Sequence, residues 1–578
     1  MKRRITPRII IHNAVKHGTH KLSRDLGAPV RYLRLRNKRV APFHRIPPPL
    51  NFPESKIAQA LLKGHFQYGA QRIDVGEQGD PWSIPAPSEK FAYWLHGFSW
   101  MDDFTSLAAK STPIRIRFLI DRWVSIYGKW NAYAWKNELI AERLFYWLSH
   151  WSPTLATDTF SDQAQLRRNN VLKQLKQLHR TYSQTKPGLD RLRACVTLAM
   201  AGAIMQDNQA VFYAFGLDQL EDELAVQILP DGGHISRRPD AILSALNYLT
   251  RLDLVLKARQ IDPPRKLTRS LSRLQAALDF FTFPEGKLAC FNGGGEGNLA
   301  MLKLLSQHAS LPERPFSYCP QSHYQRIEQG ESIILIDGGG PAAFPYDREA
   351  HLAPLAFELG THSGRMIVNC GYSPQQPLKW RSAMRATDAH TTLTLDGKSA
   401  GDLLKGRLRT QILGAAIKRA ADKVKITRQE RDIGVWIDSH HDGYHSMSGL
   451  SHHRRIFMAT SGDDIRGEDV LSIPLGSVPI RHDTLPFTIR FHLHPSVRAT
   501  LAQDRQSALI IQPDNKGWRF RTDGGPLSIE PSVYLGEGHK PQRTEQIIIS
   551  GQAVADSDGQ TRSNRVRWSF LRLEANRT

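Results

Sequence analysis

The polar stretch at residues 228–240, ILPDGGHISRRPD, carries the side chains best suited to chemistry on an acidic substrate. Asp231-Gly232-Gly233 is a turn signal between two helical stretches, and loops held by rigid elements are where binding residues gather. His234 can accept or donate a proton near neutral pH, and Arg237 and Arg238 can pair with a carboxylate such as that of a uronate. The stretch therefore predicts a carboxylate-binding loop at the rim of a cleft, with a solvated helix–helix connection as the competing interpretation.

A second polar stretch, CFNGGGEGN at residues 290–298, is rich enough in glycine to suggest a phosphate-binding loop. No Gly-Lys-Ser/Thr follows it and no strand clearly precedes it, so a nucleotide site is not predicted. The favoured interpretation is a tight turn between helices that places Asn292 near the cleft.

The elements that would position these residues change in type near residue 315. From about residue 90 to 310, apolar residues recur at three- and four-residue spacing, which indicates consecutive helices joined by short breaks. Such helices pack as antiparallel neighbours in a bundle, a solenoid or a closed toroid. From about residue 320, many short alternating runs indicate the antiparallel strands of a β-sandwich.

The positive charge of the chain is concentrated at its N-terminus. The formal net charge is +22, and residues 1–46 hold thirteen Lys and Arg against one acid, Asp25. Such a stretch is typical of a solvated arm, and contact with anionic lipid, nucleic acid or an acidic glycan stays open. Neither a membrane-spanning run nor the apolar core of a secretory signal is visible.

The stretch from Gly434 to Leu471 has the most specific pattern in the chain. It reads GVWIDSHHDGYHSMSGLSHHRRIFMATSGDDIRGEDVL, with strand-like runs around polar connections. A strand, an H-D-G-Y segment, a basic R-R strand and a G-E-D strand follow in this order, and this order resembles the C-terminal domain of the heparinase II/III family. The resemblance, in the order of its motifs, covers roughly residues 110–475. It implies an α+β multidomain fold, an N-terminal (α/α) toroid followed by a C-terminal antiparallel β-sandwich, and cleavage of acidic polysaccharides.

Three domains are expected from these patterns together. They are a basic N-terminal arm with a Pro-rich connector at residues 1–89, an (α/α) toroid at 90–315 and a heparinase II/III-like β-sandwich at 316–578. The lack of a visible signal peptide favours the cytoplasm, whereas family analogy favours the cell envelope or periplasm.

Three pieces between residues 349 and 397 resemble one further module of the family. In metal-containing members, a His of the first piece, an acid of the second and a His of the third hold zinc. The resemblance carries these roles to His351, Asn369 and His390. Imidazole nitrogens suit zinc, whereas the uncharged amide of Asn369 is a weaker replacement for an acid.

The sequence departs from active members of the family at positions that carry out the reaction. Their D-G-G-x-x-E-x-S-x-x-Y-H loop aligns with Asp231–Ile242, where Ser236 stands for Glu, Ala241 for the catalytic Tyr and Ile242 for His. A second reacting His of active members is replaced by Glu349.

Elimination from a uronate requires a neutralised carboxylate, a base for the C5 proton and an acid for the leaving oxygen. Without the aligned Tyr, other groups must serve. The candidates for catalysis are His234, His351, Glu349 and Tyr346. The candidates for substrate binding are Arg237, Arg238, Asn292, Arg381 and Arg385.

Several functions stay open from the sequence. The leading hypothesis is a heparinase II/III-like polysaccharide lyase, or a diverged relative, that acts on a uronate-containing polysaccharide. The second is a non-catalytic protein that retains acidic glycans on the same scaffold. The third is an inverting glycosidase whose acids would come from Asp102, Asp103, Asp231 and Glu296. No nucleic-acid-binding module is recognisable.

Overall fold

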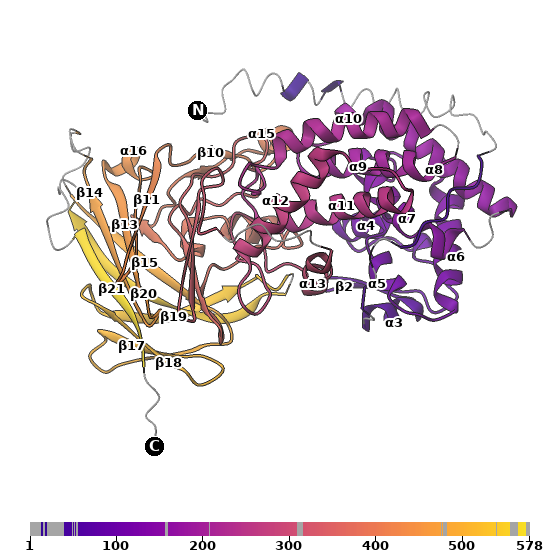
Figure 1. The fold of residues 1–578 in the computed structure, drawn as a ribbon. Coiled ribbons are helices and arrows are strands. Elements are labelled where there is room, and N and C mark those ends of the chain that lie inside the picture. Colours follow the sequence, from indigo (N-terminus) through magenta and orange to yellow (C-terminus); the bar gives the residue numbers. More distant parts are fainter. Residues whose placement is uncertain are drawn as a thin grey trace.

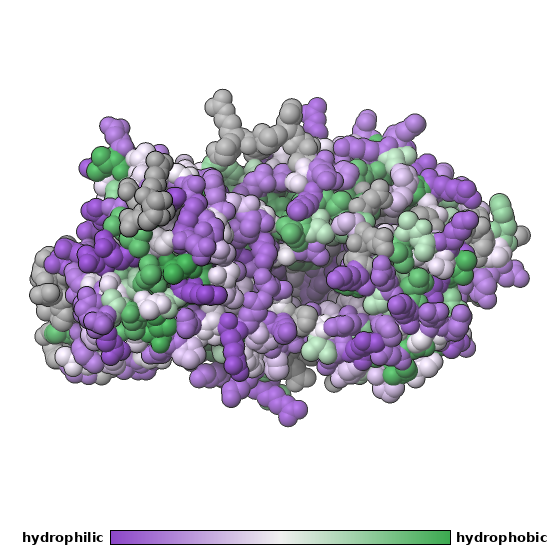
Figure 2. Space-filling model, turned by 90° about the horizontal axis from the view of Figure 1, so that it is seen from below, coloured by the Kyte–Doolittle hydropathy of each residue, from purple (hydrophilic) through white to green (hydrophobic). Residues whose placement is uncertain are grey.

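The computed structural model shows two halves side by side, one built of helices and one of strands (Figure 1). It describes residues 13–15, 18–19, 40–48, 50, 52–53, 56–156, 160–206, 209–308, 316–474, 477, 483–538, 540–554 and 564–573. Within these residues, every helix is too short or too polar to cross a bilayer. Seen from below, the surface is hollowed where the halves meet, and hydrophilic residues surround the hollow (Figure 2).

The helical half is organised around one central, buried helix. Its helices are α4 (Glu89–Gly97), α5 (Met101–Thr105), α6 (Ser111–Tyr127), α7 (Asn137–Ser149), α8 (Asp162–Thr181), α9 (Leu189–Ile204), α10 (Gln209–Gln227), α11 (Pro239–Ala258), α12 (Arg265–Phe281) and α13 (Leu299–Gln307). α9 is buried on all sides from Leu192 onward, and α7, α10 and α11 pack around it. Ser161 caps α8 by accepting from the Ala164 N–H, and Pro239 opens α11, so local sequence sets where these helices begin.

The described residues that precede α4 are packed onto this half. They form α3 (Lys56–Leu62) and the hairpin β1 (His65–Tyr68) and β2 (Gln71–Asp74). Val40, Phe43 and Ile46 are buried in the same apolar core as the helices. Residues 40–89 therefore contribute to the helical half, whereas most of the basic stretch before them lies outside the described residues.

The strand half is a sandwich of two antiparallel sheets. The first has the order β11 (Val424–Arg431), β12 (Gly434–His441), β13 (Ser451–Ala459), β14 (Asp464–Ser472), β21 (Arg565–Arg572), β18 (Gly517–Thr522), β17 (Ser507–Ile511), β16 (Arg498–Leu501). The second has the order β19 (Leu527–Tyr534), β20 (Gln542–Val554), β15 (Thr484–Leu493), β7 (Gly364–Val368), β6 (Phe357–Thr361), β5 (Ser332–Asp337), β4 (Tyr324–Gln329), β3 (Tyr318–Cys319), and β8 (Leu393–Leu395) also pairs with β15.

Apolar side chains from both sheets fill the space between them. Phe357 of β6 stacks on Trp568 of β21 with 5.6 Å between ring centres and 7° between planes. Such contacts bury large aromatic surfaces, which dominate core energetics. The predicted fold class, helices followed by an antiparallel β-sandwich, is confirmed.

The R-R and G-E-D motifs form a buried ion pair inside the sandwich. Arg454 of β13 and Asp469 of β14 face each other across the sheet and are both buried, whereas Arg455 and Glu468 point outward. The Asp469 carboxylate accepts from His452 at 2.6 Å, from Arg454 at 2.7 Å and, on its other oxygen, from the Trp568 indole at 2.8 Å. These neighbours hold the pKa of Asp469 below its usual range even though burial alone would raise it.

This buried pair also supports the loops that reach the other half. Arg454 donates to the Leu355 and Thr391 carbonyls at 3.0 and 2.9 Å, and Tyr444 of the H-D-G-Y segment donates to the Leu393 carbonyl at 2.6 Å. The motifs that carry the family resemblance are therefore structural. They fix the segments around residues 351–356 and 390–393.

Candidate functional site

The helical half and the sandwich meet around a pocket of about 290 Å³. His234, Arg238 and Ala241 line it from the helical half, and Tyr346 and Glu349 line it from the sandwich. The structure thus gathers three predicted catalytic candidates and one predicted substrate-binding residue at one place. His234 and Arg238 are more than 100 positions away in sequence from Tyr346 and Glu349.

His234 stabilises the turn in which it lies through hydrogen bonds at both ring nitrogens. Its Nδ1 accepts from the Ser236 backbone N–H at 3.2 Å and lies 2.6 Å from the Ser236 hydroxyl. Its Nε2 therefore carries the proton and donates to the Gln227 side-chain oxygen at 3.0 Å. Burial lowers the pKa of His234 to about 3, and Arg238 adds to the effect. Both ring nitrogens are occupied within the protein, which leaves none for proton transfer to a substrate.

Arg238 and Glu349 neutralise each other at the pocket wall. The Arg238 guanidinium pairs with Glu349 and also with Asp240, to which it donates at 3.0 and 2.6 Å. Gly293 of the glycine-rich stretch packs on Glu349, and a Cβ there would lie 2.7 Å from the Glu349 carbonyl oxygen. This close approach, together with a φ of 96° at Gly293, explains the glycine without any phosphate.

Arg237 and Asn292 lie behind the pocket and join the two halves. Arg237 pairs with Asp337 and donates to the Ser322 and Gly340 carbonyls at 2.8 and 2.6 Å. The Asn292 amide donates to the Tyr324 hydroxyl at 2.7 Å and to Asp337 at 2.8 Å. Both side chains are buried, so their polar groups hold the interface.

The Arg385 side chain also forms hydrogen bonds to backbone carbonyl groups. Its guanidinium donates to the carbonyls of Ala350, Ala415 and Asp347 at 2.8, 2.6 and 3.0 Å. Burial lowers the pKa of Arg385 to about 10. Arg381 is half-buried on the short helix α14 (Leu378–Ala383) and does not line the junction pocket.

His351 and His390 form a buried pair of imidazoles. His390 Nδ1 donates to the Ala386 carbonyl at 2.8 Å, so its Nε2 accepts from His351 Nδ1 at 2.6 Å. The remaining nitrogen, His351 Nε2, is buried and has no partner among the described residues. Burial lowers the pKa of both rings, to about 4 for His390, so both are neutral at pH 7.

The predicted zinc ligands do not fit zinc in this arrangement. The two imidazoles are hydrogen-bonded to each other. The Asn369 side-chain oxygen accepts from the Thr391 N–H at 3.1 Å, and its amide nitrogen donates to Glu358 at 3.2 Å. Zinc sites in proteins use three or four ligands, and no carboxylate replaces the amide here.

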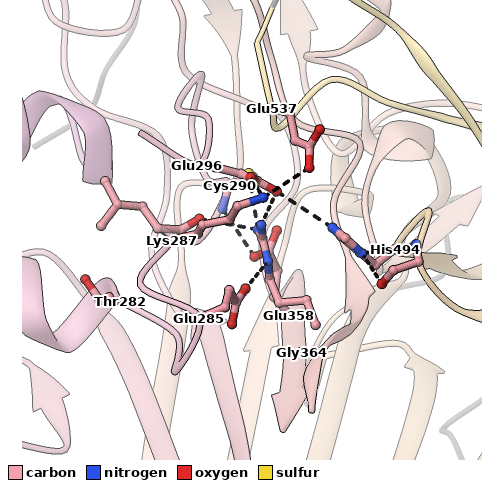
Figure 3. A network of polar contacts seen from close by, with 12 residues as sticks. Thr282, Glu285, Lys287, Cys290, Glu296, Glu358, Gly364, His494 and Glu537 are labelled. Atoms are coloured by element: carbon pink, nitrogen blue, oxygen red, sulfur yellow. Dashed lines mark hydrogen bonds and ion pairs between the residues drawn. The ribbon is translucent and has the colours of Figure 1, made fainter. Parts of the chain in front are cut away.

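A polar cluster that the sequence reasoning missed lies along the same junction (Figure 3). Arg365 of β7 is buried and pairs with Glu285 at 2.8 Å and with Glu296. Lys287 lies 2.7 Å from Glu296 and 3.0 Å from Glu537. Burial would raise the pKa of Glu296, but His494, Arg365 and Lys287 hold it well below its usual range.

Part of this cluster has the composition of a metal site. One ligand atom each from Glu296, His494 and Glu537 lies within 4.8 Å of the others, a spacing that could hold a metal ion. Lys287 already bridges the two carboxylates, so a cation is present in the protein itself. The signal in the sequence was only Glu296 in the glycine-rich stretch, because its partners lie up to about 240 residues away.

Comparisons with known proteins agree with this architecture. The family model described as "Heparinase II/III-like, C-terminal" matches residues 311–569. FtsZ-localized protein C of Caulobacter vibrioides (strain NA1000 / CB15N) is 32% identical over 522 residues, which cover 89% of this chain and 88% of that protein.

Two solved structures show the same fold over nearly the whole chain. The crystal structure of heparinase III has a TM-score of 0.68 and 15% identity, covering 97% of this chain and 91% of its own. The heparan sulfate lyase HepC from Pedobacter heparinus has a TM-score of 0.58 and 14% identity, covering 91% and 84%. The scaffold is thus that of polysaccharide lyases, and the chain belongs to the heparinase II/III-like family.

Proposed function

We propose that this chain binds acidic glycans without cleaving them. The observation that carries the proposal is Ala241, which lines the junction pocket where the family resemblance expects the catalytic Tyr. Ala241 and Ile242 are each 1% exposed, and only Ala241 lines the pocket, so the wall at this position is apolar. A methyl group can neither remove the C5 proton nor protonate the leaving oxygen.

The other candidates in the pocket do not replace the missing group. His234 uses both ring nitrogens within its own turn, and Glu349 is held by Arg238. Burial raises the pKa of Tyr346, so its phenol is protonated and is a weak base at pH 7. Asp190 is the other carboxylate in the lining, and it pairs with Arg193 at 3.0 Å, so both carboxylates of the pocket lie beside an arginine.

The junction pocket contains positively charged side chains that suit the binding of an acidic glycan. Lys186, Arg238 and Arg348 line the pocket, and the Arg348 Nε is buried without a partner among the described residues. A guanidinium is well matched to a carboxylate or sulfate group. The small volume suits one acidic sugar residue of a longer chain. Incubation with acidic polysaccharides, with ultraviolet detection of the unsaturated ends that elimination creates, tests the absence of cleavage.

A second function is favoured by the relative named for FtsZ. The identity of 32% extends over 89% of this chain, so both halves of the molecule are shared with that protein. We infer that this chain also associates with FtsZ. Such a role depends on binding surfaces and does not need turnover, which is consistent with the loss of the catalytic Tyr.

Co-sedimentation with FtsZ of the source organism tests this association. We expect the purified chain to pellet with FtsZ polymers formed with GTP and to stay in the supernatant when GTP is omitted, because only polymers sediment. Equal pelleting with and without FtsZ polymers would contradict the association. The glycan-binding proposal would be unaffected by that result.

A further inference from the structure

A second pocket lies within the helical half, away from the junction. Its volume is about 460 Å³, and it opens between the side chains of Pro48, Leu50 and Phe52, the turn between α5 and α6, and the end of α7. α11 begins at the junction pocket and reaches the polar end of this second pocket at Arg251, roughly 18 Å further along the helix at 1.5 Å per residue. The two pockets share no lining residue.

The polar end of this pocket contains a hydrogen-bonded chain of buried side chains. Arg251 donates to one oxygen of Asp102 at 2.6 Å, and His150 Nε2 donates to the other at 2.7 Å. Because a carboxylate only accepts, this contact places a proton on Nε2, and Nδ1 is the ring nitrogen that stays available to a ligand. Arg251 and Asp102 thus orient the imidazole.

Two buried polar side-chain atoms of residues in the pocket lining have no hydrogen-bond partner among the described residues. His150 is 1% exposed and Thr112 is 2% exposed. His150 Nδ1 and Thr112 Oγ1 make no hydrogen bond to any described residue. An unpaired buried polar atom costs about 1–3 kcal/mol. Both residues line the same pocket, and a polar group of a ligand that reached these two atoms would give them the partners they lack.

The remaining lining sets the shape and charge of the ligand. Leu50, Phe52, Leu107 and Pro113 make the walls apolar. Lys110 lines the pocket, is exposed, and forms no ion pair with the described residues. The pocket thus combines a hydrogen-bonding inner end, apolar walls and a cation at its mouth.

We propose that this pocket binds a small amphipathic acid, with an aromatic or short aliphatic body that carries a hydroxyl group at its inner end. The hydroxyl donates to His150 Nδ1 and accepts from the Thr112 hydroxyl. The carboxylate lies at the mouth and pairs with Lys110. The volume is within the range of about 300–1,000 Å³ that small-molecule sites occupy. This site is independent of the glycan-binding proposal, because none of its residues lies at the junction.

Three related probes test the site on the full chain by calorimetry. Phloretic acid has all three features, hydrocinnamic acid lacks the hydroxyl, and phloretamide lacks the acid. We expect phloretic acid to bind about three- to tenfold more tightly than hydrocinnamic acid, since a neutral hydrogen bond contributes about 0.5–1.5 kcal/mol. We expect phloretamide to be weaker as well, and this difference to shrink in added salt.

Two variants make the test specific to this pocket. Thr112→Val keeps the shape of the side chain and is expected to weaken phloretic acid while leaving hydrocinnamic acid unchanged. Ala108→Trp, at an exposed lining position, is expected to block all three probes, with thermal melting as the check on folding. No binding of any probe at millimolar concentration, equal binding of the first two probes, or unchanged binding in folded Ala108→Trp would overturn the proposal.

Discussion

Replacing Arg365 by methionine is expected to lower the free energy of unfolding by about 3–5 kcal/mol. Arg365 is 1% exposed and joins β7 of the sandwich to Glu285 and Glu296 on the stretch that follows α12. Methionine fills a similar volume but leaves the buried Glu296 with less positive charge nearby. Breaking a buried pair by removing one partner costs far more than an exposed pair contributes.

Urea denaturation of wild type and two control variants measures this effect. Arg466→Met removes an arginine whose side chain is 67% exposed and which pairs with Asp464 at 2.5 Å, and we expect a change of about 0–1 kcal/mol. The double variant Arg365→Met with Glu296→Gln removes the uncompensated charge and should recover part of the loss. Equal denaturation midpoints for Arg365→Met and Arg466→Met would show that the cluster does not hold the halves together.

Asp469→Asn is expected to destabilise the sandwich by about 3–5 kcal/mol, because it leaves the buried Arg454 charge unpaired. All four contacts to the Asp469 carboxylate come from N–H groups. The NH₂ group of an asparagine would therefore face N–H donors and could not accept their hydrogen bonds. Asp438→Asn is the matched control. Asp438 pairs with Arg455 at 2.7 Å on the outer face of the same sheet, and the side chains of both residues are exposed.

The effect of Asp469→Asn should depend on pH in a defined direction. The pKa of Asp469 is lowered in the folded protein, so its contribution to stability is fully present above the unfolded value near 3.8 and is lost as the pH falls below it. Denaturation at several pH values should show a constant difference from wild type between about pH 5 and 8, and a narrowing difference below about pH 4. A difference that widens with falling pH would contradict the assignment of this carboxylate as ionised.

Much of the fold could be predicted from local sequence. The change from helical to alternating spacing near residue 315 reflects which faces each element buries, and in the structure the long helices lie before that point and the two large sheets after it. The R-R and G-E-D runs are predicted as strands from their residue pattern, whereas the pairing of Arg454 with Asp469 follows from the register of β13 and β14. The packing of Val40 and Phe43 into the helical half could not be predicted, because the basic stretch beside them suggested a separate arm.

The location of the candidate site was more predictable than the roles of its residues. His234, Arg238, Tyr346 and Glu349 do line one pocket. What each side chain can do there depends on partners remote in sequence, such as Glu349 for Arg238. The sequence points to one acid of the Arg365 cluster, Glu296, and to one member of the His150–Asp102 pair, Asp102, but not to their partners, because these contacts join residues that follow no motif. The residue roles and the domain limits stay predictions.

The most direct test of the account is the rate at which the purified chain forms unsaturated uronate ends from acidic polysaccharides. Heparan sulfate, chondroitin, hyaluronan and alginate supply the main arrangements of uronate, and binding is measured in parallel by calorimetry at low salt. The account predicts binding of an acidic glycan and no ultraviolet-absorbing product above the level of heat-denatured protein, since Ala241 lines the pocket at the position where the family resemblance expects the catalytic Tyr. Steady product formation by wild type that is lost in a folded His351→Ala or Tyr346→Phe variant would contradict it and would establish the chain as a lyase.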